Sequence, residues 1–227
     1  MFAFDFSDCQ LFSFLMVDIS CFAMYDRIRK TERGKPFVTH EKILRLTTCA
    51  VFAAILCLLS PIALPVGGPV PFALQIFAVM LCSVTLDWVT AQGAVLVYLL
   101  LGLFLPIFSG GNTGLTAIPG PTGGYIWSYL LMVPVIRLFR IPRIRGRFKT
   151  YALALTGCVL AACVCYLCGT AQFALVTGNT FAASLSVCVV PFLGFDLLKA
   201  AAASILGVEL ARALEKVRMH SAAPGQT

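Results

Sequence analysis

Residues 151–168 read YALALTGCVLAACVCYLC, a run without a charged side chain. An α-helix needs about 20 predominantly apolar residues to cross the hydrocarbon core of a bilayer, and this run approaches that length. A strand of a membrane barrel would instead alternate between apolar and polar positions over roughly 10 residues. The run therefore indicates a membrane-spanning helix, and other long apolar runs in the chain favour a helical membrane protein.

The composition of the whole chain supports this class. The sequence has 227 residues, of which 59% are hydrophobic and 12% charged, and its mean hydropathy is +0.92. A soluble domain carries roughly 25% charged residues. So little charge cannot cover a surface that faces water, which excludes soluble enzymes, nucleic-acid-binding domains and secreted disulfide-rich scaffolds. At about 20 residues per crossing, the chain has room for roughly six spans.

The positive charges are grouped in three segments. Lysine and arginine number 17, and all but Lys199 lie in residues 27–45, 137–149 or 212–218. Basic segments that flank apolar spans are typical of the cytoplasmic side of a membrane, where they face anionic lipid. We therefore interpret the net charge of +7 as a signal of membrane topology and expect no nucleic-acid partner.

The apolar segments predict an all-α, polytopic membrane protein with six transmembrane helices. The predicted spans are residues 43–61, 71–86, 93–106, 123–136 and 151–168, and then residues 181–190 followed by a last helix over 191–214. A short turn is expected at residues 87–92. The other connections on that scheme, residues 62–70, 107–122 and 169–180, contain no Lys or Arg and are placed outside the cell. Both termini then lie in the cytoplasm, with the protein in the cell membrane.

Three parts of the chain follow from these spans: an N-terminal extension (1–42), a six-helix domain (43–214) and a cytoplasmic tail (215–227). Three aspartates interrupt the apolar residues of the extension, and no basic residue precedes Arg27, so neither a secretory signal nor a span is expected there. Two interpretations stay open for the extension: a start codon assigned too early, and a functional segment.

Enzyme motifs are absent from the sequence. It contains no GxxxxGK[ST] phosphate loop, no GxSxG and no HExxH. Most of the ten cysteines lie in apolar runs, where a cysteine behaves as a small hydrophobe. The pair Cys165 and Cys168 has no second pair or histidine nearby to complete a metal site. We therefore expect no catalytic residues, no metal and no cofactor.

Asp196 and Lys199 are the main candidates for a binding site. They are the charged residues of the otherwise uncharged stretch between residues 151 and 208, and their spacing puts them on one face of a helix. Charges inside a membrane are rare and usually mark a ligand or ion pathway. The alternative is an ion pair that only fixes helix packing, although apolar residues could replace such a pair at little cost.

Two further segments are candidates. The glycine-rich stretch from Ser109 to Tyr125 is uncharged and falls on the same side of the membrane as Asp196. There Asn112 offers a donor and an acceptor, and Tyr125 offers an apolar ring with a polar tip. In the first span, Ala50 and Ala54 are small residues four apart, which permits close helix approach or ordinary packing.

Five segments in order carry a family resemblance: PVPFALQ (69–75), GAVLVYLLLG (93–102), GGN (110–112), GPTGGY (120–125) and PFLGFDLLK (191–199). The series resembles BioY, the biotin-binding S component of energy-coupling factor (ECF) transporters, over roughly residues 44–214. Two departures are Gly194-Phe195, where the family usually has Pro-Gly, and the absence of a basic residue from residues 87–92.

The resemblance implies a six-helix protein that captures biotin from outside the cell. A membrane-embedded coupling protein and two ATPase subunits would then drive uptake. Asn112, Asp196 and Lys199 match polar positions of the biotin pocket, and Tyr125 matches the tyrosine that ends the glycine motif. Ala50 and Ala54 match the pattern by which S components dock on the coupling protein. The alternatives are an S component for another small vitamin and a membrane scaffold that transports nothing.

Overall fold

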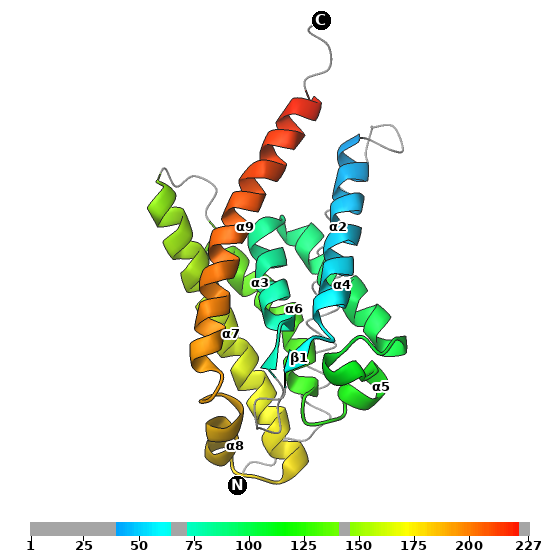
Figure 1. Ribbon diagram of the computed structural model, residues 1–227, viewed down its shortest axis with the longest axis vertical. Coiled ribbons are helices and arrows are strands. Elements are labelled where there is room, and N and C mark those ends of the chain that lie inside the picture. Colours follow the sequence, from blue (N-terminus) through cyan, green and yellow to red (C-terminus); the bar gives the residue numbers. More distant parts are fainter. Residues whose placement is uncertain (1–39, 65–71, 141–145, 223–227) are drawn as a thin grey trace, which may run out of the picture. The chain divides into compact units, whose positions relative to one another are not determined.

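The computed structural model describes residues 40–64, 72–140 and 146–222 (Figure 1). The chain divides into two units, residues 1–44 and 45–227, and the first is described only where it begins a helix, at residues 40–44. The elements in chain order are α2 (His40–Leu59), β1 (Ala63–Leu64), β2 (Phe72–Ala73), α3 (Gln75–Thr85), α4 (Trp88–Phe104), the 3-10 helix η1 (Ser109–Gly111), α5 (Gly114–Ala117), α6 (Gly123–Leu138), α7 (Arg147–Thr177), α8 (Phe181–Cys188) and α9 (Leu193–Ala222).

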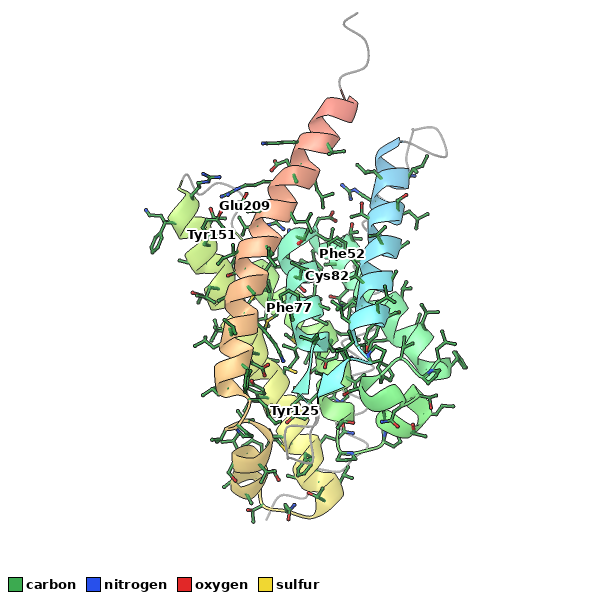
Figure 2. All side chains as sticks on the ribbon, in the orientation of Figure 1. Phe52, Phe77, Cys82, Tyr125, Tyr151 and Glu209 are labelled. Carbon is green, nitrogen blue, oxygen red and sulfur yellow. The ribbon has the colours of Figure 1, made fainter. Side chains whose placement is uncertain are left out.

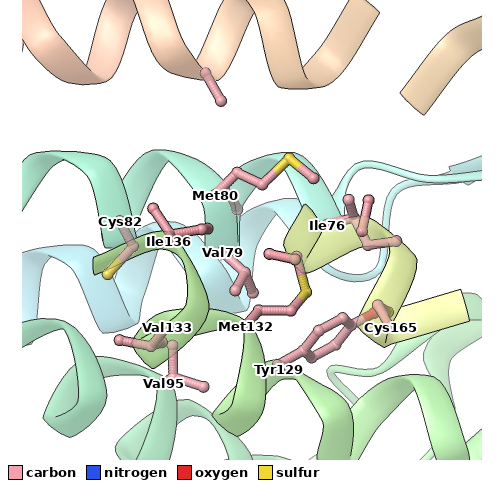
Figure 3. Close-up of a cluster of buried hydrophobic side chains, with 14 of the residues drawn as sticks. Ile76, Val79, Met80, Cys82, Val95, Tyr129, Met132, Val133, Ile136 and Cys165 are labelled. Carbon is pink, nitrogen blue, oxygen red and sulfur yellow. The ribbon is translucent and has the colours of Figure 1, made fainter. Parts of the chain in front are cut away.

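The second unit is a set of apolar helices packed side by side. Helix α6 packs along α7, α9 packs along both α3 and α7, and α4 packs against α6. Figure 3 shows the core between them, where Met80 from α3, Val95 from α4 and Met132 from α6 are fully buried. The predicted all-α class is confirmed, apart from the two-residue strands β1 and β2.

Glycines set how closely the helices approach. A Cβ atom at Gly124 of α6 would lie 2.5 Å from the Cys168 carbonyl oxygen of α7, and one at Gly207 of α9 would lie 2.8 Å from the Val84 side chain of α3. Small residues at such crossings bring backbones together, which increases van der Waals contact between membrane helices. These glycines therefore explain the close α6–α7 and α3–α9 pairs.

The helices differ greatly in length. Helix α7 has 31 residues and spans about 46 Å, more than the roughly 30 Å of a bilayer core. By length and composition, two described helices, α2 and α7, are able to cross a membrane, and a third crossing results if α8 and α9, bent by 60°, count as one span. Helices α3, α4 and α6 are apolar but shorter. The apolar helical fold is thus observed, whereas six crossings stay a prediction.

The predicted turn at residues 87–92 is wrong. Helix α4 already begins at Trp88, because Asp87 caps its N-terminus: the carboxylate accepts a hydrogen bond from the Thr90 backbone N–H at 3.3 Å and from the Thr90 hydroxyl. An aspartate that bonds free N–H groups at a helix start is a standard N-cap. The polar residues that suggested a turn therefore start a helix.

The uncharged stretch at residues 169–180 is also mostly helical. Helix α7 continues to Thr177 and ends at Gly178, whose φ of +71° is the left-handed conformation that favours glycine at a helix end. Helices α8 and α9 follow, with the break between them at residues 189–192. The expected separation of residues 181–190 from the last helix is therefore observed, although α9 runs on to Ala222.

Strands β1 and β2 position a backbone carbonyl for the site. They pair antiparallel, with Ala63 opposite Ala73, and the N–H of Leu74 donates to the Ile62 carbonyl at 3.3 Å. Helix α3 begins directly afterwards at Gln75. The pair therefore holds the carbonyl of Ala73 at the start of α3, where it faces Lys199 of α9.

Candidate functional site

A cavity of about 640 Å³, counted to its open mouth, lies in the second unit. Small-molecule sites are typically clefts lined mostly by apolar and aromatic side chains with a few polar groups, and the lining here is of that kind. Its polar and tyrosine lining residues are Gln75, Ser109, Thr122, Tyr125, Tyr129, Tyr166, Asp196 and Lys199. Its other lining residues are Ala73, Ile76, Phe108, Ala117, Ile126, Cys188 and Phe192.

The ion pair of Asp196 and Lys199 lies in the wall of this cavity. The Lys199 Nζ atom lies 2.8 Å from Asp196 Oδ1, and the two residues are 8% and 5% exposed. Lys199 also donates to the Ala73 carbonyl oxygen at 2.8 Å. The other carboxylate oxygen, Oδ2, accepts a hydrogen bond from the Tyr166 hydroxyl. The two residues thus lie on one helix face, as predicted. The pair also joins α9 to α7 through Tyr166 and to β2 through the Ala73 carbonyl.

The start of α9 favours a negative charge at Asp196. The residue lies in the first turn of the helix, where the unpaired N–H groups and the helix dipole stabilise an anion. Burying two charges is costly even when they are paired. Each carboxylate oxygen can accept more than one hydrogen bond, so Asp196 can still accept from a ligand in the cavity. The arrangement therefore presents a fixed acceptor to a polar ligand.

Tyr125 lies in the same cavity, at the start of α6. Figure 2 labels it in the part of the unit that holds α8, well away from Tyr151 and Glu209. Its ring packs on Gly169 of α7, where any Cβ atom would overlap the ring. Its hydroxyl is buried and has no hydrogen-bond partner among the described residues. The structure therefore brings Tyr125, Asp196 and Lys199 together around one cavity.

Gly123 and Gly124 of the GPTGGY motif face α7 and do not line the cavity. A Cβ atom at Gly123 would clash with the Ile118 carbonyl and would lie 2.5 Å from Gln172 Nε2. Gln172 donates to the carbonyl oxygens of Ile118 (2.6 Å) and Gly120 (2.9 Å), and it accepts from the Trp127 indole at 3.0 Å. Gln172 therefore fixes the glycine loop to α7, and the glycines make room for it.

Asn112 lies outside the lining of the cavity. It is exposed, and its amide donates to the Ser109 carbonyl oxygen at 3.1 Å. Its backbone pairs with Phe108, which together with Ser109 does line the cavity. Gly110 and Gly111, both with φ near +75°, form the tight turn between these residues. Asn112 is thus next to the site but not in contact with the space inside it.

Ala50 and Ala54 lie together on the exposed face of α2. The neighbouring exposed side chains on this face include Leu46 and Leu58, each 73% exposed. The opposite face of the helix is buried through Phe52, Ala53 and Leu56. The two alanines are therefore placed apart from the cavity, on an apolar surface.

Tyr166 and Gln75 are site residues that the sequence analysis missed. Tyr166 lies inside the apolar run 151–168, where a tyrosine is a polar-tipped residue among apolar ones. Gln75 is 2% exposed and donates to the Tyr98 hydroxyl, which in turn lies 2.7 Å from the Ser60 hydroxyl. Each of these residues carries the lone polar group of an apolar segment. That isolated polar group is the sequence signal by which a site residue could be recognised here.

Comparison with known proteins gives consistent results. The sequence profile of the BioY family matches residues 30–216. The chain is 34% identical to the biotin transporter BioY2 of Lactococcus lactis subsp. cremoris, over 77% of this chain and 94% of that protein. It is 31% identical to the biotin transporter BioY of Thermotoga maritima, over 73% of this chain and 95% of that one.

A solved structure has the same fold. It is the crystal structure of the S component for biotin from an ECF-type ABC transporter, which superposes with a TM-score of 0.68 at 22% identity. The match covers 78% of this chain and 95% of that one. The helical arrangement described above is therefore that of an S component.

Proposed function

Because the chain belongs to the BioY family, we propose that it is a membrane subunit that binds biotin and mediates its uptake. The observation that carries the proposal is the buried pair of Asp196 and Lys199, held by Tyr166 in the wall of a cavity whose other lining residues are mostly apolar or aromatic. A site of this kind suits a ligand with a small polar head and an apolar body.

The chemistry of biotin fits these groups. Its ureido ring has two N–H donors beside one carbonyl, so Asp196 accepts from the N–H groups and Lys199 balances that carboxylate. The thiophane ring and the valerate chain then lie against Ile76, Phe108 and Phe192. Asn112 belongs to the site on this proposal if the turn at residues 109–112 folds over the cavity mouth, where its amide would complement the ureido edge.

The proposal includes a topology of six crossings, with both termini in the cytoplasm. It is supported by the absence of Lys and Arg from residues 62–70, 107–122 and 169–180, and by the basic segments at residues 137–149 and 212–218. The protein is then a multi-pass protein of the cell membrane. It has no catalytic step and no cofactor of its own.

The energy for uptake would come from partners. We propose an ECF coupling protein in the membrane and two ATPase subunits, because the fold is that of an S component. Ala50 and Ala54 of α2 form the proposed contact with the coupling protein. Their exposure on an apolar helix face supports this, since small residues let a second membrane helix approach closely.

Biotin binding to the purified protein in detergent tests the proposal, with the wild type beside Asp196→Asn. We expect saturable binding by the wild type and a loss of about tenfold to hundredfold in the variant, because hydrogen bonds to a charged group are the stronger ones. Glu215→Gln is the matched control: it is the same change of carboxylate to amide at an exposed position of α9, away from the cavity.

Three outcomes separate the alternatives. Folded wild-type protein that ignores biotin but binds another vitamin, such as thiamine or riboflavin, would make the chain an S component with a different substrate. Binding of no vitamin at all would favour a scaffold. Equal binding by wild type and Asp196→Asn would leave biotin as the ligand but give the ion pair a purely structural role.

A further inference from the structure

A second cavity lies where α3, α7, α9 and the end of α6 meet. Its volume is about 360 Å³, counted to its open mouth, and none of its described lining residues belongs to the first cavity. On α6, Ile126 lines the first cavity and Ile136 lines the second. Ten residues of an α-helix extend about 15 Å along its axis, so the two cavities are separate spaces.

The wall of this second cavity is mostly apolar. Val84 of α3, Leu153 of α7 and Val208 of α9 line it. Thr150 lines it as well, but its hydroxyl donates to the Gly146 carbonyl oxygen of the preceding turn at 3.0 Å. Removing apolar surface from water is favourable, so a hydrocarbon chain covers such a wall better than water does.

Arg140 is the charged side chain among the described residues of this lining. Its Nη1 atom donates to the Thr85 carbonyl oxygen at 3.0 Å and to the Val84 carbonyl oxygen, both at the end of α3. The side chain is half-buried, and these bonds fix its guanidinium in the cavity wall. Arginine stays charged in proteins, and its planar guanidinium matches the geometry of a phosphate. The cavity therefore combines apolar walls with a fixed cation.

Further basic side chains lie near this cavity. Arg147 and Lys149 are exposed in the first turn of α7. Residues three apart are neighbours on a helix surface, so Arg147 lies one turn before Thr150 on the face that lines the cavity. Arg147 is also close enough to Glu209 of α9, the residue after Val208, for the two charges to interact. The basic residues of α6 and α7 thus meet around one space.

The described carboxylates near the cavity have basic partners. Glu209 forms an ion pair with Arg212 at 2.6 Å. Asp87 interacts with Arg137, whose guanidinium donates to the Leu86 carbonyl oxygen at 2.8 Å. Since the basic side chains here outnumber these two carboxylates, the charge around the cavity is positive.

We propose that this second cavity binds an anionic phospholipid of the bilayer. The phosphate lies at Arg140 and Arg147, and the first part of an acyl chain covers the apolar wall at Leu153 and Val208. Basic pockets between membrane helices are typical binding sites for anionic lipid headgroups. The positive charge favours an anionic headgroup over a zwitterionic one, and the apolar wall favours a lipid over a free phosphate. The inference goes beyond the proposed function, because it requires a membrane protein but no biotin.

Native mass spectrometry of the purified protein in detergent tests this with three probes: phosphatidylglycerol, phosphatidylcholine and glycerol 3-phosphate. We expect the wild type to bind phosphatidylglycerol about tenfold more tightly than phosphatidylcholine, and at least about a hundredfold more tightly than glycerol 3-phosphate, which has no acyl chain. Arg140→Gln removes the fixed cation and should lower the affinity for phosphatidylglycerol to that for phosphatidylcholine. Thr150→Leu fills part of the cavity and should weaken both lipids by a similar factor.

Arg45→Gln is the matched control, because Arg45 is exposed on α2 and does not line the cavity, so both lipid affinities should stay unchanged. If Arg140→Gln does not fold, Arg147→Gln carries the charge test from an exposed position. It should weaken phosphatidylglycerol alone, by about threefold to tenfold.

Four results overturn the inference: equal binding of the two lipids by the wild type, binding of glycerol 3-phosphate as tight as that of phosphatidylglycerol, unchanged lipid binding in the cavity variants, or a loss in Arg45→Gln as large as theirs. Biotin is not a probe in this experiment. Its result is therefore independent of whether the proposed function holds.

Discussion

Lys199 connects α9 to β2 through its ammonium group, and this makes it a stability residue as well as a site residue. It bonds Asp196 one turn earlier on α9 and the Ala73 carbonyl beside α3. Lys199→Met leaves a buried carboxylate without its cation, which we expect to lower the free energy of unfolding by about 3–5 kcal/mol. Thermal unfolding in detergent measures the effect, and a melting temperature equal to that of the wild type would contradict it.

A double variant separates stability from binding. Replacing both charges, as Asp196→Leu with Lys199→Met, removes the cost of burying an unpaired charge, since apolar residues replace a buried ion pair with little or no loss. We expect the double variant to regain most of the stability lost in Lys199→Met and yet to bind no biotin. If the double variant still binds biotin, the pair serves packing alone.

At this scale the sequence predicts neighbours on one helix but not partners from another. Asp196 and Lys199 are three residues apart, and that spacing alone places them on one face. Tyr166 bonds Asp196 from 30 positions earlier in the chain, and Gln172 holds a loop that lies more than fifty positions before it. Such contacts depend on how α7 packs, which spacing within a segment does not reveal.

At the scale of elements, the packing of α6 on α7 depends on glycine. A Cβ atom at Gly169 would overlap the Tyr125 ring, so we expect Gly169→Ala to lower the free energy of unfolding by about 1–3 kcal/mol, the usual cost of overpacking. Gly194→Ala is the matched control, because a Cβ atom there meets nothing within 4 Å. In that helix the exchange should leave stability unchanged or raise it by at most about 1 kcal/mol. Chemical or thermal unfolding measures the stability of both variants, and equal stabilities of the two would contradict the expectation.

The ends of elements were predicted well only where a clear breaker stands. Helix α6 begins at Gly123 as predicted, directly after the Pro and Gly residues of the loop. Helix α4 was placed too late, because Asp87 was interpreted as part of a turn although aspartate caps helices as readily as it forms turns. The predicted end of the fifth span, at residue 168, is too early: α7 runs on to Thr177, and Gly169 serves close packing against Tyr125.

For the whole molecule, the proposed function places ligand binding and partner docking on different surfaces. The cavity lies among α3, α6, α7 and α9, whereas Ala50 and Ala54 are exposed on α2. The buried face of α2 is nevertheless connected to the cavity wall, because Ser60, directly after the helix, bonds Tyr98, and Tyr98 bonds Gln75. Large side chains on the exposed face should therefore disturb docking and leave that connection intact.

The variants Ala50→Trp and Ala54→Trp test this separation. On the proposed function, each should keep the biotin affinity of the wild type in detergent, because the substituted side chain points away from the core. Biotin uptake by cells that contain the coupling and ATPase subunits should fall to background, since a bulky residue prevents the close helix contact that small residues permit. Ala152→Trp, at an exposed position of α7, is the control and should leave uptake intact. Normal uptake by both α2 variants would exclude this face as the docking surface, and loss of binding would mean that α2 helps to shape the cavity.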